Sequence, residues 1–126
     1  MPEPFHVLVA EDEPLAAMAI EDFLSRKGYR VTLAVDGQDA MERQSADPAD
    51  IIVTDLRMPR MDGKHLIRAL RAVDPTLPVV IMTGYLSFGP EDDDLAGGAS
   101  QPLEVLRKPV NPQDILDTLQ RLLTKG

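Results

Sequence analysis

The sequence contains no cysteine among its 126 residues. This absence excludes catalysis by a thiol, metal sites built from thiolates and a fold held by disulfide bonds. Long hydrophobic runs are also missing: no apolar stretch approaches the about 18 residues that a membrane-spanning helix needs, so we expect no membrane span. The first residues carry no basic stretch ahead of an apolar segment, so we expect no secretory signal and a cytoplasmic location.

Basic residues are in the minority: 13 Lys and Arg stand against 21 Asp and Glu, which gives a formal net charge of −8 at pH 7. An acidic surface repels phosphate backbones, so we expect no direct nucleic-acid binding by this chain. The length is that of one ordinary domain, which buries roughly two thirds of its unfolded surface and needs no disulfide or structural metal to fold. We therefore expect one domain that covers residues 1–126.

Five short apolar segments predict β-strands, because each is too short for a helix and most are rich in Val and Ile. They are residues 5–10, 31–35, 51–53, 79–82 and 105–106. Three of them are continuously apolar, which is typical of parallel strands covered on both faces. Residues 31–35 alternate in polarity and 105–106 is brief, so we expect these two strands at the sheet edges.

Segments with a helical spacing of apolar residues separate the strands. We expect helices over residues 14–27, 38–46, 64–73 and 111–124. In the first, an apolar stripe from Leu15 to Leu24 faces inward and Gly28 ends the helix; in the third, the inward face ends at Val73. The last has Asn111 as its N-cap and a proline at the first helical position.

Residues 84–102 have a different character, because glycines and prolines flank the acidic run 91–94. We expect a short or irregular fourth helix that begins at Pro90, and a solvated acidic face in place of a second cation site.

The alternation of strands and helices predicts an α/β fold, (βα)5, in which helices cover both faces of one parallel sheet. Ligands of such open sheets bind beyond the carboxyl ends of the strands.

Chemically active side chains follow four of these strands. They are Glu11 and Asp12, then Asp55, Thr83 and Lys108. Converging carboxylates repel each other, which raises a pKa or requires a cation. Mg²⁺ is suited to such a site because it prefers oxygen ligands and takes one or two carboxylates together with a phosphate oxygen. Acids, a hydroxyl and an ammonium at one sheet edge therefore predict phosphoryl chemistry.

The residues at these strand ends also carry a family resemblance. Residues 51–63, with the sequence IIVTDLRMPRMDG, together with Glu11-Asp12, Thr83 and Lys108-Pro109, resemble the receiver domain of the two-component response regulators. The resemblance runs from end to end and indicates a CheY-like receiver, which is either a single-domain protein or a module of a longer regulator. It implies a flavodoxin-like three-layer fold with the strand order 2-1-3-4-5.

The resemblance also implies a role for each matching residue. Asp55 is expected to accept a phosphoryl group from a phosphohistidine on a sensor histidine kinase or a phosphotransfer protein. Mg²⁺ is expected to be held by Glu11, Asp12 and Asp55, with Asp12 the more direct ligand of the acidic pair, and by the backbone carbonyl of Arg57.

Two further positions complete the expected phosphoryl site. Thr83 and Lys108 are expected to bind phosphoryl oxygens, and the peptide bond that precedes Pro109 is expected to be cis.

The sequence departs from the family pattern at several positions. Val105 stands where many members have an aromatic residue that turns inward on activation, and Val110 stands where a phenylalanine is common. The chain between Thr83 and Lys108 is a few residues longer than usual. Tyr85 has two open interpretations: a gate over the phosphoryl pocket, or an ordinary loop aromatic.

Three functions remain open from the sequence. The first is a receiver that signals by protein contact to an unknown downstream target, as a monomer or a weak phosphorylation-dependent dimer. The second is a degenerate receiver that acts as a constitutive protein-binding adaptor without phosphorylation. The third is a small Mg²⁺-dependent phosphatase, which ranks last because Arg57 stands where such enzymes have a second acid. We expect no enzyme activity beyond phosphotransfer to Asp55 and autodephosphorylation.

The two histidines and two of the methionines have simpler expected roles. His6 and His65 lack the spacing of a metal-binding pair. Met58 and Met61 are expected to serve packing.

Overall fold

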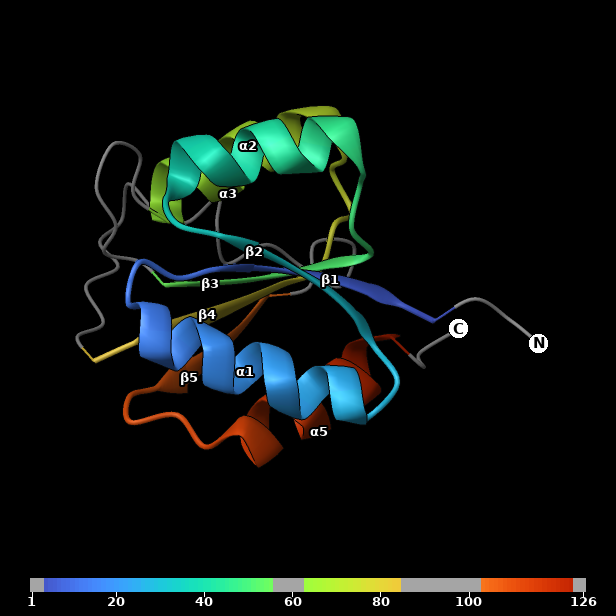
Figure 1. The fold of residues 1–126 in the computed structure, drawn as a ribbon. Helices are drawn as coiled ribbons and strands as arrows, with labels where there is room; N and C mark the ends of the chain where they lie inside the picture. Colours follow the sequence, from blue (N-terminus) through green and yellow to red (C-terminus); the bar gives the residue numbers. More distant parts are fainter. Residues whose placement is uncertain (1–3, 56–62, 85–102, 124–126) are drawn as a thin grey trace.

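The computed structural model describes residues 4–55, 63–84 and 103–123. Its centre is a five-stranded parallel sheet in the order β2-β1-β3-β4-β5 (Figure 1). The strands are β1 (His6–Ala10), β2 (Arg30–Ala34), β3 (Ile51–Asp55), β4 (Val79–Thr83) and β5 (Leu103–Arg107). The predicted order and the two predicted edge strands are confirmed.

Helices cover both faces of the sheet, which gives the predicted flavodoxin-like, three-layer architecture. They are α1 (Pro14–Arg26), α2 (Gly37–Ala46), α3 (Gly63–Val73) and α5 (Pro112–Leu123). Helices α1 and α5 lie on one face, and α2 and α3 lie on the other (Figure 1). The segment of the expected fourth helix, with Tyr85, lies outside the described residues.

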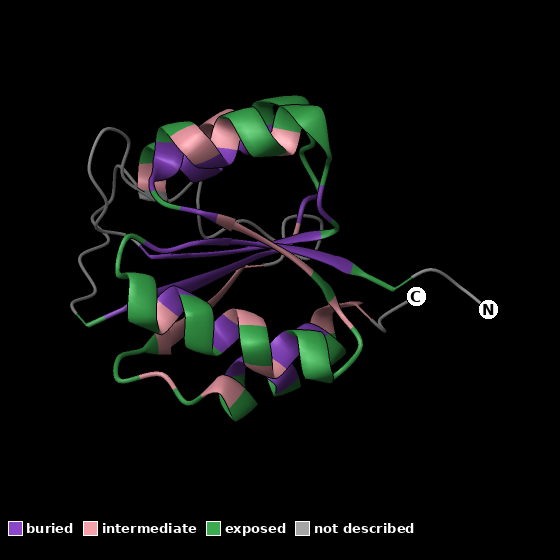
Figure 2. Cartoon of the chain, in the orientation of Figure 1, coloured by how far each residue is buried: buried purple, intermediate pink, exposed green. Residues whose placement is uncertain are grey.

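The core consists of two apolar clusters, one on each face of the sheet. Alternate strand residues supply them: Leu8 and Ile52 pack on the side of α2 and α3, whereas Val7 and Val53 pack on the side of α1 and α5. Every residue of β1, β3 and β4 is buried, and Figure 2 shows these strands as a continuous buried layer. This explains why their sequences are continuously apolar.

Local signals in the sequence set the helix ends. The side chain of Asp36 accepts a hydrogen bond from the backbone N–H of Asp39 at 2.8 Å at the start of α2. Asn111 accepts one from the backbone N–H of Gln113 at 2.9 Å, which confirms its predicted capping of α5. Gly28 follows α1 with a φ of +96°, a left-handed conformation that favours glycine.

Two predictions about helix faces are wrong. Leu15 is 76% exposed and Val73 is 84% exposed, although both were expected to face the sheet. Helix α1 instead buries Ala17, Ile20 and Leu24, which share one face at spacings of three and four residues. Leu15 lies well outside that narrow arc, and Val73 is the last residue of α3, where the helix leaves the sheet.

Three strands are longer than predicted. Strand β3 continues to Asp55, β4 continues to Thr83, and β5 spans five residues where two were expected. Periodicity missed these ends because polar side chains interrupt the apolar pattern there. As a result, Asp55 and Thr83 belong to the sheet itself and are held by its hydrogen bonds.

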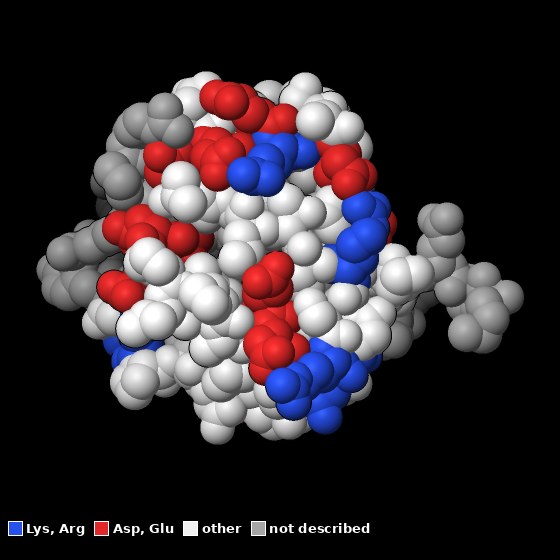
Figure 3. Space-filling model, viewed as in Figure 1, with Lys and Arg blue, Asp and Glu red and all other residues white. Residues whose placement is uncertain are grey.

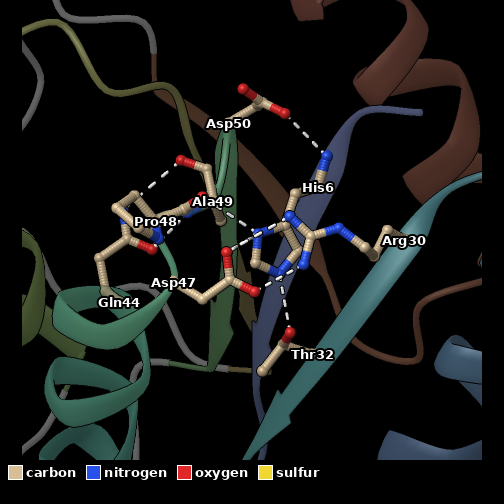
Figure 4. A network of polar contacts seen from close by, with 8 residues as sticks. All are labelled: His6, Arg30, Thr32, Gln44, Asp47, Pro48, Ala49 and Asp50. Atoms are coloured by element: carbon tan, nitrogen blue, oxygen red, sulfur yellow. Dashed lines mark hydrogen bonds and ion pairs between the residues drawn. The ribbon is translucent and has the colours of Figure 1, made fainter. Parts of the chain in front are cut away.

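A network of polar contacts around His6 closes the end of the sheet where the strands begin (Figure 4). The His6 ring is buried, with Nδ1 3.1 Å from the carbonyl oxygen of Pro48 and Nε2 2.7 Å from the hydroxyl of Thr32. Because a carbonyl only accepts, Nδ1 carries the hydrogen of that bond. Both ring nitrogens have protein partners, so His6 ties β1 to β2 and to the loop before β3.

Beside this ring, an ion pair joins β2 to the end of α2. Arg30 Nη1 lies 2.6 Å from Asp47 Oδ2, and this hydrogen bond lowers the pKa of the Asp47 carboxyl. The backbone N–H of His6 donates to Asp50 Oδ2 at 2.7 Å. The contacts drawn in Figure 4 thus join β1 to β2 and to the loop before β3.

Charge is mixed on the face drawn in Figure 3, where separate groups of Asp and Glu alternate with smaller groups of Lys and Arg. On that face the described basic side chains form no continuous surface. Such a surface offers little attraction to a phosphate backbone. Among the residues that the structure describes, no helix is long and apolar enough to cross a membrane.

Candidate functional site

The predicted site residues are placed at the carboxyl ends of the strands. Glu11 follows β1, Asp55 ends β3, Thr83 ends β4 and Lys108 follows β5. Strands β1 and β3 are neighbours although β2 separates them in sequence, so the winding of the chain reverses between them. This reversal is where open α/β sheets form a ligand crevice, and Glu11 and Asp55 flank it.

Three carboxylates meet in this crevice. One oxygen from each of Glu11, Asp12 and Asp55 lies within 4.8 Å of the other two, a spacing that a single cation could bridge. Glu11 is 2% exposed and Asp55 is 7% exposed, whereas Asp12 is open to solvent. The cluster therefore has two buried members fixed by the sheet and one member that solvent can reach.

Burial perturbs the protonation of Glu11. Loss of solvent raises the pKa of its carboxyl, and the nearby Asp55 charge acts in the same direction. Two contacts oppose this shift: Glu11 Oε2 accepts a hydrogen bond from the backbone N–H of Glu13 at 3.1 Å, and the Lys108 charge lies nearby. The net shift is upward, so an additional positive charge at this position is favourable.

Lys108 supplies positive charge to two of the acids. Its Nζ lies 2.5 Å from Asp55 Oδ2 and 3.5 Å from Glu11 Oε1. Partial burial alone would lower the pKa of Lys108, but the hydrogen bond and the charge of Asp55, with the charge of Glu11, raise it. The ammonium therefore stays charged and neutralises part of the cluster.

The backbone joins Lys108 to Thr83. The N–H of Lys108 donates to the carbonyl oxygen of Thr83 at 2.8 Å, and the Lys108–Pro109 peptide bond is cis, as expected. Thr83 is 2% exposed, at the same sheet edge as Asp55. A methyl group at Gly84 would lie 3.8 Å from Lys108 Cβ, an ordinary contact.

Of two further predicted positions, the structure describes Val105 and does not describe Arg57. Arg57, whose carbonyl was expected to bind the metal, lies outside the described residues. Val105 is half-buried on β5 and packs against the core cluster on the side of α2 and α3. It is the place of the family aromatic, and here a small β-branched side chain fills it.

A cavity of about 290 Å³ adjoins the site, and sequence reasoning did not foresee it. Glu11 and Lys108 line its polar side, while Ala16, Ala19 and Val110 are among its apolar walls. Ala16 is half-buried and Ala19 is exposed, so small side chains on α1 leave this hollow, which a hydrophobicity pattern does not reveal. A second cavity of about 440 Å³, between the ends of α2 and α3, contains none of the site residues.

The donor set fits a hard divalent cation. Carboxylate oxygens are the ligands that Mg²⁺ prefers, and one exposed acid beside two buried ones leaves room for water ligands. Burial, the main cause of the raised pKa of Glu11, and the nearby Asp55 charge both favour a further positive charge here. Glu11, Asp12 and Asp55 would hold such an ion.

Comparisons with known proteins agree with this geometry. The response regulator receiver domain family matches residues 7–120. The chain is 31% identical over 119 residues to the response regulator receiver protein CpdR of Brucella abortus, covering 93% of this chain and 95% of CpdR. It is 32% identical over 122 residues to the response regulator MprA of Mycolicibacterium vanbaalenii, covering 97% of this chain but only 52% of MprA.

A solved structure extends the comparison. The receiver domain of the sensor histidine kinase PA1611 from Pseudomonas aeruginosa, which has a magnesium ion coordinated in its active-site cleft, is similar with a TM-score of 0.78 and 31% sequence identity. The match covers 94% of this chain and 96% of that one. Fold, strand-end residues and sequence matches all agree, and the chain belongs to the response regulator receiver domain family.

Proposed function

We propose that this chain is a phosphorelay receiver that accepts a phosphoryl group on Asp55 in a Mg²⁺-dependent reaction and signals through a surface that changes on phosphorylation. The donor is a phosphohistidine on a sensor histidine kinase or a phosphotransfer protein. The observation that carries the proposal is the meeting of Lys108 Nζ with Asp55 Oδ2 at 2.5 Å beside the Glu11 and Asp12 carboxylates. Residues 1–126 act as one receiver domain, in the cytoplasm.

The chain's own residues have distinct parts in the transfer. A carboxylate oxygen of Asp55 attacks phosphorus, the phosphorus–nitrogen bond of the donor breaks, and its electron pair leaves with the imidazole. Lys108 and the hydroxyl of Thr83 bind oxygens of the transferred group. When bound to Glu11, Asp12, Asp55 and the backbone carbonyl of Arg57, Mg²⁺ supplies charge neutralisation for the moving phosphoryl group. The coordinated ion of the PA1611 receiver domain supports that part of the proposal.

Exposed apolar side chains on α1 provide a place for the donor protein. Leu15 is 76% exposed and Met18 is 58% exposed, and α1 begins three residues after Glu11. Exposed large apolar residues next to a reactive site are typical of a docking surface. We propose that the donor covers Leu15 and Met18 while its phosphohistidine enters the crevice.

The signal that the receiver passes on follows from the charge that the phosphoryl group adds. A phosphoryl group brings about −1.5 to −2 charges and new acceptor oxygens next to Lys108 and Thr83. Because the Lys108 N–H is bonded to the Thr83 carbonyl, a movement of one strand end moves the other. Val105 offers no aromatic ring to turn inward, so the change passes through the β4 and β5 ends to a downstream protein.

One experiment tests the proposal. The chain is incubated with Mg²⁺ and phosphoramidate, with and without EDTA, and wild type is compared with Asp55→Asn. We expect one added phosphoryl group by intact mass, labile to base, absent in the variant and much reduced by EDTA. A chain that gains no phosphoryl group in any condition contradicts the proposal.

Two other outcomes point to the alternative functions. The degenerate adaptor has one observation in its favour, the small Val105 in place of the aromatic. It predicts no adduct together with unchanged partner binding in Asp55→Asn. Hydrolysis of many phosphate esters per chain would instead indicate a phosphatase.

A further inference from the structure

The cavity between the ends of α2 and α3 is separate from the phosphoryl site. Its volume is about 440 Å³, within the range of small-molecule pockets. The last turns of the two helices and the loop before β3 supply its lining. Helices α2 and α3 cover the face of the sheet opposite to α1 and α5, so a ligand here leaves the proposed donor surface on α1 open (Figure 1).

The interior of this cavity is apolar. Leu70 is 4% exposed and belongs to the core cluster, and Met41 packs against that cluster. Pro48 adds a wall, and Val73, at the end of α3, is 84% exposed. The fold thus leaves apolar surface in contact with water, and a hydrocarbon chain bound here would remove that surface from water.

Hydrogen bonds fix one wall of the cavity. The backbone N–H of Ala49 donates to Gln44 Oε1 at 2.8 Å, and Gln44 Nε2 donates to the carbonyl oxygen of Ala49 at 3.5 Å (Figure 4). These bonds tie the end of α2 to the loop that carries Pro48. The wall is therefore formed before any ligand arrives, which lowers the cost of ordering on binding.

The charge at the mouth of the cavity is negative. Asp74 is exposed and is the charged residue of the lining. Its carboxylate accepts a hydrogen bond from the Thr76 hydroxyl at 3.4 Å, and it forms no ion pair with a Lys or Arg of the described residues. The C-terminal ends of α2 and α3 both lie here, and the partial negative charge of helix C-termini also favours a cation.

We propose that this cavity binds a primary alkylammonium ion, with the hydrocarbon chain against Leu70 and Met41 and the ammonium at the mouth beside Asp74. The buried position of Leu70 and the exposed position of Asp74 set this orientation. Binding does not depend on phosphorylation of Asp55.

The orientation distinguishes a free amine from a lysine side chain of a partner protein. A lysine side chain carries its charge at the tip and would bring that charge to the apolar floor. The lining is also much smaller than the roughly 20–30 residues that a stable protein interface uses on each side. Both observations favour the small ligand.

The test compares ligands of matched length by calorimetric titration of the whole chain. Butyl-, pentyl- and hexylammonium are the series, and hexanol and hexanoate are the neutral and anionic references. We expect the affinity to rise about three- to fourfold for each added methylene. Hexylammonium should bind more tightly than hexanol, and hexanoate more weakly. Acetyl-lysine methylamide, which presents a lysine side chain, should bind more weakly than hexylammonium.

Two variants change the cavity, and each has a matched control. Asp74→Asn should weaken hexylammonium binding about two- to fivefold, as for an exposed ion pair, and leave hexanol unchanged. Ser45→Leu fills the space and should remove the increase with chain length. Asp117→Asn on α5 and Ser25→Leu on α1 make the same changes away from the cavity and should keep the wild-type affinities. Thermal unfolding checks that each variant is folded.

Several outcomes would overturn the inference. They are an affinity that does not rise with chain length in wild type, equal binding of hexylammonium and hexanoate, and an unchanged series in folded Ser45→Leu. Acetyl-lysine methylamide that binds as tightly as hexylammonium would show that a lysine of a partner protein fits the cavity, and would overturn the assignment to a free amine. None of these results bears on the transfer to Asp55, which is tested separately.

Discussion

The carboxylate of Glu11 would bind a cation in its charged form, but its burial favours the neutral form. Its carboxylate lies in the cation cluster with Asp55, yet it is 2% exposed, and burial raises its pKa. A group whose pKa is higher in the folded than in the unfolded state stabilises the fold at low pH, and this contribution is lost as pH rises through the folded value. At neutral pH, the charged form therefore costs stability when no cation is bound.

The upward direction of the Glu11 pKa shift leads to a prediction for Glu11→Gln. The variant should unfold at a temperature about 2–5 °C higher than wild type at pH 7 in EDTA, because the neutral amide avoids the burial of charge. The difference should shrink as pH falls below the ordinary Glu value of 4.5, because the wild-type carboxyl then becomes protonated in both states. Differential scanning calorimetry at several pH values measures it.

The control for this prediction is Glu21→Gln, on α1 away from the cluster, which should show no such pH-dependent gain. A Glu11→Gln variant that is less stable than wild type at every pH would contradict the account of Glu11.

The side-chain ammonium of Lys108 lies beside the carboxylates that would bind a divalent ion. Its Nζ contacts both Asp55 and Glu11. Lys108→Gln should therefore bind Mg²⁺ roughly tenfold more tightly, since the ion no longer competes with an ammonium for these oxygens. Calorimetric titration measures the affinity, with Lys27→Gln at the far end of α1 as a variant of equal charge. Equal affinities in the two variants would show that the ammonium does not compete.

At the scale of single elements, the end of α1 depends on the backbone conformation of one glycine. Gly28 ends α1 with a φ of +96°, and a methyl group there would meet no heavy atom within 4 Å. The requirement at this position is therefore backbone conformation and not space. Gly28→Ala should lower the free energy of unfolding by about 1 kcal/mol.

Urea unfolding measures this loss, and Gly84→Ala is the matched comparison. At Gly84 the added methyl group meets only Lys108 Cβ at 3.8 Å, so a much smaller change is expected. If both variants lost the same stability, the left-handed conformation of residue 28 would not be the cause.

Element types followed from the sequence because alternation, buried Val- and Ile-rich runs and capping residues are local signals, whereas the strand order followed from the resemblance to receiver domains. Asn111 and Gly28 were recognised in this way, and both act as predicted. Helix rotation was not recognised, because Leu15 and Ala17 are both apolar and only packing against the sheet selects one of them. The convergence of Glu11, Asp55 and Lys108 followed from strand topology, whereas the cavity beside them depends on side-chain volumes that no motif records.

At the scale of the whole molecule, the sheet divides the core into two clusters that share no strand face. Ile67 of α3 packs in one and Ile115 of α5 packs in the other, and both are fully buried. Ile67→Val and Ile115→Val should each cost about 0.5–1.5 kcal/mol. Their effects should add to within about 0.5 kcal/mol, because no partner is common to both sites.

Chemical denaturation of the two single variants and the double variant completes this cycle. Ile67→Val with Ile81→Val, both in one cluster, is the contrasting pair. A coupling between residues 67 and 115 as large as that within one cluster would mean that the sheet transmits strain from one helical layer to the other.

The hydrogen bond from the Lys108 N–H to the Thr83 carbonyl has a consequence for the evolution of this site. It joins main-chain atoms, so no ordinary side-chain replacement at residue 83 removes it, and at residue 108 only proline would. Replacements at these two positions can change which anion is held, or abolish binding, while the gap between the strand termini keeps its width. A receiver could thus lose its chemistry and still present an intact scaffold to its binding partners.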